Sequence, residues 1–219
     1  MVVRPRRPIF GAMRTLITLF LALSLSASAQ VKHGPRIGLS LATISAGGVF
    51  NWSGLPKPGP ILGWSIEVPW TAQASFLIEP MYITKGSLTQ NAQLRTFTSV
   101  RLGYLELPVM FKISTDTVPG GFFLTGGLMA GWWMNGRQVV RQDGNVLFES
   151  SYTLQGTTNR SQVSMGLGFG WDRPRSRFEV RYQTSITPFS TVLRGQNVVA
   201  GLHYTYLLPA AQRTSSKDQ

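Results

Sequence analysis

The sequence predicts an all-β protein, an eight-stranded antiparallel up-and-down transmembrane β-barrel with short periplasmic turns and long surface loops. Three observations predict it. Runs of alternating apolar and polar or small residues recur along the chain. The connections between these runs are alternately long and short, and aromatic residues gather where the runs meet the short connections. Period-two alternation is typical of strands with two unlike faces, and an even strand number with one short-turn end is typical of barrels that cross a membrane.

The first 29 residues have the pattern of an export signal. Four arginines precede an apolar run at 16–25, and "SASAQ" then offers an Ala-x-Ala cleavage site that ends at Ala29. The run is about ten residues, shorter than the roughly 20 that a spanning helix needs, so an N-terminal anchor is the weaker alternative. We expect a signal peptide at 1–29, with Met13 as an alternative start to Met1.

Length, charge and cysteine content limit the class of protein. The 219 residues fit one domain, which we divide into a leader at 30–34, a barrel at 35–208 and a polar periplasmic tail at 209–219. The chain has no cysteine, which excludes disulfides and a lipid-modified cysteine anchor. Loss of the four N-terminal arginines lowers the net charge from +12 to +8. The remaining cations are dispersed except in "DRPRSR" at 172–177, a pattern that favours contact with anionic lipid phosphates over nucleic acid.

Eight runs are expected to form the strands, in chain order 35–43, 60–68, 73–84, 100–113, 121–134, 162–171, 177–184 and 196–208. Long connections are expected at 44–59, 85–99, 135–161 and 185–195, and short ones at 69–72, 114–120 and 172–176. Short turns at one end and long loops at the other describe a meander that goes up and down across a membrane.

Each run places apolar side chains on one face and small or charged ones on the other. "LGWSIEV" at 62–68 alternates Leu, Trp, Ile and Val with Gly, Ser and Glu, and "YLELPVMFKI" at 104–113 alternates apolar residues with Glu106, Pro108 and Lys112. The glycine-rich "VSMGLGFGW" at 163–171 and "FEVRYQ" at 178–183 repeat the pattern. Periodicity alone does not say which face points inward.

The chemistry of the two faces favours a membrane barrel, whose apolar face meets lipid while polar groups fill the lumen. The polar face is rich in glycine, as a narrow lumen requires. Aromatic residues near the short turns are expected to form a membrane-interface belt: Trp70, Phe122, Trp171 and Tyr206. The alternative is a secreted, soluble, lipocalin-like barrel that binds an apolar ligand.

Several segments resemble the PorT-like outer-membrane β-barrel family: "GPRIGLSLATIS", "YLELPVMFKI", "GGFFLTGGLMAGW" and "FEVRYQTSITPFS". The most specific is the Tyr-Leu-Glu-Leu-Pro block at 104–108, and the similarity runs over about 36–208. In addition, "GLHYTY" at 201–206 resembles the last-strand signal read by the barrel-assembly machinery, although the tail continues beyond it. The resemblance implies an eight-stranded barrel in the outer membrane of a Gram-negative bacterium, with a role in surface transport or protein export and no catalytic residues.

Catalytic, cofactor and metal sites are not expected. "MGLGFG" at 165–170 lacks the following helix of a phosphate-binding loop. A lipid-modifying barrel enzyme, the alternative function, needs a histidine beside a serine, whereas His203 is flanked on its face by Gly201 and Thr205. The chain lacks the Cys, paired His or acidic loop of a metal site.

The polar faces instead predict a charge network in the lumen, formed by Arg36, Glu67, Glu79, Glu106, Lys112, Glu179, Arg181 and His203. Buried charges are tolerated when they are paired and hydrogen-bonded. We expect Glu106 to pair with an inward cation such as Lys112, Arg181 or Arg36. Because Pro108 lacks a donor in a barrel without a free edge, we expect a β-bulge there.

The sequence therefore predicts a non-enzymatic outer-membrane barrel with a surface transport, protein-export or structural role. Its expected partners are outer-membrane lipids and the assembly machinery, with secretion components or surface ligands reached through the long loops.

Overall fold

A computed structural model describes residues 31–45, 55–116, 120–152, 160–188 and 195–209. Within these ranges the chain forms ten strands, all antiparallel: β1 (Lys32–Ser45), β2 (Lys57–Pro69), β3 (Ala74–Ile78), β4 (Met81–Asn91), β5 (Thr96–Ser114), β6 (Phe122–Gln142), β7 (Asn145–Tyr152), β8 (Ser161–Arg173), β9 (Ser176–Ser185) and β10 (Gln196–Tyr206). No helix in the described ranges is long and apolar enough to cross a membrane. The expected signal peptide at 1–29 and most of the tail at 209–219 lie outside the described residues.

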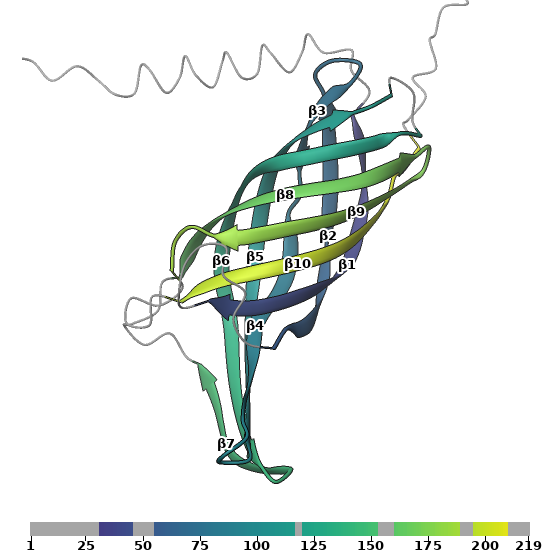
Figure 1. Cartoon of the computed structure of the whole chain (residues 1–219). Coiled ribbons are helices and arrows are strands. Elements are labelled where there is room, and N and C mark those ends of the chain that lie inside the picture. The colour runs from purple at the N-terminus through teal and green to yellow at the C-terminus, as the bar shows by residue number, and fades with distance from the viewer. Residues whose placement is uncertain (1–30, 46–54, 117–119, 153–159, 189–194, 210–219) are drawn as a thin grey trace, which may run out of the picture. The chain divides into compact units, whose positions relative to one another are not determined.

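The strand pairings form a closed circle, and Figure 1 shows the tilted strands that take part in it. β1 pairs with β2, β2 with both β3 and β4, these two with β5, and β5 with β6. β6 then pairs with β8, β8 with β9, β9 with β10, and β10 with β1. Since β3 and β4 occupy a single position in this circle, the barrel has the eight predicted strand positions.

The third predicted strand, 73–84, is interrupted at Glu79 and Pro80, next to Pro108 of β5. The register of β5 is the same against β3 as against β4, which places Glu79 opposite Pro108. The Glu79 N–H donates to the Pro108 carbonyl at 3.0 Å, but proline has no N–H to return the bond, and Pro80 follows directly. The missing donor at Pro108 is therefore placed opposite a break in its neighbour, with no extra residue in either strand.

The expectation of a bulge at Pro108 was wrong. The register of β5 and β6 shifts instead between Gly103 and Tyr104, where Met134 is the extra residue on β6. The bulge marks the level at which β5 and β6 leave the barrel wall and continue outward, which agrees with the tendency of bulges to lie at barrel rims.

The barrel has a turn end and a loop end, as predicted, but the bounds of the connections differ from the predicted ones. At the turn end, residues 70–73, 115–121 and 174–175 connect neighbouring strands. At the loop end, the predicted loops 85–99 and 135–161 are largely strand, since β4 and β5 form a hairpin and β6 and β7 form another. Apart from Gly86, Ser87, Leu102 and Gly136 next to the barrel, these extensions are exposed or half-buried on both faces. Such strands do not need apolar alternation, so the sequence pattern did not reveal them. β1 also begins at Lys32, inside the predicted leader.

These extensions form a projecting sheet, which we define as residues 86–91, 96–102, 136–142 and 145–152. Its four strands are hydrogen-bonded in the order β4, β5, β6, β7. Figure 1 shows β7 and the adjoining ends of β5 and β6 beyond the loop end of the barrel. The barrel wall thus continues into a surface structure without an intervening linker.

The apolar face of each strand points outward. Leu105, Leu107 and Leu167 are 51%, 44% and 72% exposed, whereas the inward Glu106 is 1% exposed. A soluble barrel would bury the apolar set and expose the polar one, so the lipocalin-like alternative has no support. An apolar outer wall around a polar interior is the arrangement that suits a lipid solvent.

Glycines on the inner wall admit bulky side chains near the turn end. A Cβ on Gly170 would lie 2.1 Å from the Phe178 carbonyl oxygen and 2.4 Å from Cζ of Phe123. Phe123 is 2% exposed and fills the lumen at this level. On the outer wall, by contrast, a Cβ on Gly126 would meet only the tip of Leu167, at 3.2 Å.

We predict that Gly170→Ala destabilises the folded barrel by about 1–3 kcal/mol, because the added methyl group overpacks against backbone and ring atoms that have no room to move. The matched control, Gly126→Ala, should change stability by less than about 0.5 kcal/mol. Urea unfolding in lipid vesicles measures both. Equal stability of the two variants would contradict the packing described at Gly170.

Candidate functional site: the charged interior of the barrel

The barrel interior holds three groups of charged residues, which follow one another along the strands. Inward positions of β9 are occupied in order by Arg177, Glu179, Arg181 and Gln183, all buried. Each group takes one or two of these residues. We call them the turn-end cluster, the central cluster and the loop-end cluster.

The central cluster consists of Arg36, Glu79, Glu179 and Arg181. The Arg36 guanidinium bridges the two carboxylates, with Nη1 2.9 Å from Glu79 Oε1 and Nη2 2.5 Å from Glu179 Oε2. Arg181 Nη2 lies 2.7 Å from Glu79 Oε2 and 2.8 Å from Glu179 Oε1. The side chains come from β1, from β9 and from the break between β3 and β4, so the cluster reaches across the lumen.

Neutral side chains complete the coordination of the central cluster. Ser65 donates to Glu79 at 3.1 Å and Thr125 donates to Glu179 at 2.7 Å. Arg36 Nε donates to His203 Nδ1 at 3.2 Å, and its Nη1 donates to Thr205 at 3.2 Å. His203 thus accepts through Nδ1, which holds its imidazole in place as part of the wall.

The turn-end cluster consists of Glu67, Lys112, Asp172 and Arg177. Lys112 Nζ lies 3.0 Å from Glu67 Oε1 and also pairs with Asp172. Arg177 Nε lies 2.7 Å from Asp172 Oδ1, and Nη2 of the same guanidinium pairs with Glu67. Both cations lie over the ring of Phe123, at 5.0 Å for Lys112 and 5.5 Å for Arg177, within cation–π range.

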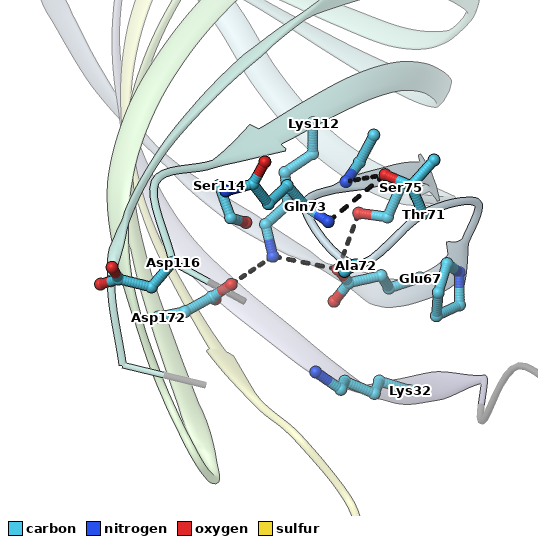
Figure 2. Close-up of a pocket in the computed structure, with 13 residues that line it drawn as sticks. Lys32, Glu67, Thr71, Ala72, Gln73, Ser75, Lys112, Ser114, Asp116 and Asp172 are labelled. Atoms are coloured by element: carbon cyan, nitrogen blue, oxygen red, sulfur yellow. Dashed lines mark hydrogen bonds and ion pairs between the residues drawn. The ribbon is translucent and has the colours of Figure 1, made fainter. Parts of the chain in front are cut away.

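A shallow pocket opens on the turn-end cluster (Figure 2), where Lys112 lies between Glu67 and Asp172. Lys32, Gln73 and Asp116 are among the other residues that line it. Its cavity volume is about 80 Å³, room for a few water molecules but far below the roughly 300–1,000 Å³ of a small-molecule site. The pocket is therefore a small polar opening over the turn-end cluster.

The loop-end cluster is the pair Lys85 and Glu106 with three surrounding amides. Lys85 Nζ lies 2.5 Å from Glu106 Oε1, and Gln183 Nε2 donates to Glu106 Oε2 at 3.1 Å. Lys85 also donates to Gln162 Oε1 at 3.2 Å, and Asn197 donates to the same oxygen at 3.1 Å. The Lys85 ammonium lies 4.9 Å from the centre of the Tyr104 ring.

Within the described residues the buried charges balance, since the interior holds five carboxylates and five cations: Glu67, Glu79, Glu106, Asp172 and Glu179, with Arg36, Lys85, Lys112, Arg177 and Arg181. Each cluster is neutral by itself. Because an isolated buried ion costs several kcal/mol, while a paired and hydrogen-bonded one is tolerated, this pairing allows the charges to remain ionised inside the barrel.

The structure places all eight residues predicted for the lumen inside the barrel, each at most 5% exposed. Glu106 pairs with an inward cation as expected, but none of the three named candidates, Lys112, Arg181 and Arg36, is its partner. The partner is Lys85, which lies in the predicted loop 85–99. A strand assignment through "MYITKGS" at 81–87, with Lys85 on the same face as Met81 and Ile83, would have found it.

The arginines of the segment 172–177 also differ from the prediction. Its arginines were expected to meet lipid phosphates in a turn, but Asp172 and Arg177 are buried in the turn-end cluster, 8% and 1% exposed. Only Arg173 and Arg175, next to the β8–β9 turn, are exposed. The sequence pattern does indicate an inward Arg177, because this residue continues the inward alternation of Glu179 and Arg181.

The residues predicted for the interface belt lie on the outer surface near the turn end. Trp70, Phe122, Trp171 and Tyr206 are 67%, 63%, 45% and 40% exposed. Phe122 and Trp171 pack against each other with ring centroids 5.3 Å apart, and Trp70 contacts Phe76 at 5.8 Å. Their position suits an aromatic girdle.

A closed antiparallel barrel with an apolar outside and an ion-paired inside defines a β-barrel membrane protein. The chain belongs to the outer membrane protein beta-barrel domain family, whose model matches residues 26–191. It is accordingly an outer-membrane β-barrel protein. A comparison with curated protein sequences gives no match.

Solved outer-membrane barrels are similar to this chain. Ail, the attachment invasion locus protein of Yersinia pestis, is 10% identical with a TM-score of 0.45, over 82% of this chain and 99% of Ail. Neisserial surface protein A is 13% identical with a TM-score of 0.44, over 81% of this chain and 97% of that one. The N-terminal barrel domain of Pseudomonas aeruginosa OprF is 11% identical with a TM-score of 0.39, over 82% and 98%.

We predict that Glu106→Ala destabilises the barrel by roughly 3–5 kcal/mol, because it leaves Lys85 buried without its counter-charge. Leu105→Ala, on the outward face of the same strand, should cost less, since it removes only contact with acyl chains. Urea unfolding in lipid vesicles compares the two.

The double variant Lys85→Met with Glu106→Gln serves as the control, because it removes both charges together. It should recover most of the stability lost in Glu106→Ala. A double variant as unstable as the single one would show that Lys85 and Glu106 do not act as a pair.

Proposed function

We propose that this protein is a closed, non-enzymatic outer-membrane barrel whose role is structural, holding the projecting sheet at the cell surface. The observation that carries the proposal is the interior itself, where the central cluster joins opposite walls through Arg36 and Arg181. An eight-stranded barrel is only wide enough for its own side chains. A lumen filled in this way favours display over transport through the barrel.

The interior chemistry gives no support to a lipid-modifying enzyme. His203 is 2% exposed and accepts a hydrogen bond from Arg36, so its imidazole serves the central cluster and does not face the lipid surface. Among the described residues, no group of three or more His, Cys, Asp or Glu side chains could hold a metal ion. The charged residues are paired for stability instead of arranged for attack on a substrate.

We further propose that the chain groups with the PorT-like barrels, on the strength of the block at 104–108. The role in surface transport or protein export that this resemblance implies would then involve the loop end, where secretion components or surface ligands would meet the projecting sheet. Assembly by the barrel machinery would act on β10, the strand that closes the barrel against β1.

The closed lumen predicts that the purified wild-type chain gives no steady conductance steps in a planar bilayer at 100 mV. An open sixteen-stranded porin in the same bilayer is the positive control, because its lumen is an aqueous channel. Regular ohmic steps from the wild-type chain would contradict a structural role for a sealed barrel and favour transport.

The proposed orientation predicts where trypsin cuts on intact cells. Arg95 and Arg141 lie next to the two hairpin turns of the projecting sheet and are exposed, so cleavage is expected there, while Arg175 at the turn end stays intact. Mass spectrometry of the fragments reads out the sites, and permeabilised cells provide the control in which Arg175 becomes accessible. Cleavage at Arg175 alone on intact cells would invert the orientation.

A further inference from the structure

The outer surface at the loop end carries an excess of positive charge. Of the charged residues described outside the barrel interior, six cations and two acids lie at this end: Lys57, Arg95, Arg101, Arg137, Arg141 and Arg160, with Asp143 and Glu149. Because the interior is neutral, this surface carries most of the described net charge. Its cations are not spread evenly.

Two of these arginines stand side by side on one face of the projecting sheet. Arg101 of β5 is the direct register partner of Arg137 of β6. Their row across the four strands reads Gly86, Arg101, Arg137, Ser151. Like charges directly opposite each other in a sheet are destabilising, and the small residues on both sides leave the two guanidinium groups open to a ligand.

The acidic residues nearby neutralise only one member of this pair. Arg137 forms an ion pair of 2.5 Å with Glu149, with side chains 58% and 44% exposed, and exposed pairs of this kind contribute little. Within the described residues, no acidic side chain pairs with Arg101. A third cation adds to the charge, because Lys57 Nζ reaches Ser99, two residues from Arg101 on the same strand face, at 2.5 Å.

The arginine pair lies just beyond the apolar wall. Leu105 and Trp132 are paired on the outward face and are 51% and 50% exposed. Met134, 55% exposed, is the last apolar side chain of β6 before Arg137. Three residues of strand span roughly 10 Å, and the strand tilt of about 40° reduces the height. When Met134 is taken as the edge of the hydrocarbon, this places the guanidinium groups at the depth of lipid headgroups.

We propose that Arg101 and Arg137, assisted by Lys57, form a binding site for the phosphate group of a phosphorylated glycolipid in the outer leaflet. Guanidinium groups bind phosphate through paired, charge-assisted hydrogen bonds, and an anion between them removes the repulsion of the opposed arginines. The position next to the apolar wall lets the acyl chains of the same lipid pack on Leu105 and Trp132. The inference rests on the proposed orientation, with the loop end at the outer leaflet.

The test measures binding of diphosphorylated lipid A to the purified full-length chain by native mass spectrometry. The ligand control is dephosphorylated lipid A with the same acyl chains. Arg101→Gln with Arg137→Gln is compared with Arg173→Gln with Arg175→Gln, which removes the same charge at the turn end. We expect the first pair to weaken binding of the phosphorylated lipid about tenfold or more, and the second to change it less than twofold.

Several outcomes would overturn the inference. If Arg101→Gln with Arg137→Gln binds diphosphorylated lipid A as tightly as the wild-type chain, the proposed site does not exist. An equal loss of affinity in this variant and in the turn-end variant would show a general effect of charge. Displacement of the lipid by millimolar inorganic phosphate would identify a free-anion site, and a preference for a sulfated polysaccharide over lipid A would identify a different partner.

Electrophoresis with and without boiling separates this inference from the proposed function. A wild-type chain that migrates differently when heated is a folded membrane barrel, so a failure of lipid A binding in that sample overturns only the phosphate site. A wild-type chain without a heat shift would remove the membrane barrel, and the phosphate site with it.

Discussion

The pairing of five buried carboxylates with five buried cations is the constraint on which the rest of the structure depends. A small barrel in lipid must turn its apolar side chains outward, so its polar side chains fill the interior. In this chain many of these inward side chains are charged. Unpaired, these ions would cost far more than the marginal stability of a folded domain. Paired across the lumen, they connect strands that are distant in the sequence and fix which strand faces which.

The same pairing explains the irregularities of the barrel wall. Glu79 reaches the central cluster from the break between β3 and β4. It lies opposite Pro108, which has no N–H to donate, and Pro80 follows it in the chain. Phe123 fills the turn end of the lumen between Lys112 and Arg177, and it fits because Gly170 faces it from β8. Close packing and ion pairing therefore support each other at this end.

A neutral, filled interior is the reason that we place the proposed functional surface on the outside of the barrel. The projecting sheet continues β4, β5 and β6 beyond the wall and adds β7, so that it is held by the same hydrogen-bonded ladders as the barrel. Its exposed cations stand outside the neutral clusters. Arg95 and Arg137 form exposed pairs with Asp143 and Glu149, whereas Arg101 has no acidic partner among the described residues.

The sequence by itself determined the barrel class and the eight strand positions, because alternation is a local property that each strand repeats. The chemistry of the two faces, with glycine and charge on one and apolar and aromatic residues on the other, determined which face points inward. It also identified eight inward residues, among them Glu106. Only the tertiary structure decided which charges pair: Glu106 binds Lys85, and Arg177 binds Glu67 and Asp172. Ion pairs across a lumen depend on strand register and tilt, which no single strand encodes. The projecting sheet was also missed, since strands that are mostly exposed or half-buried on both faces carry no continuous apolar stripe.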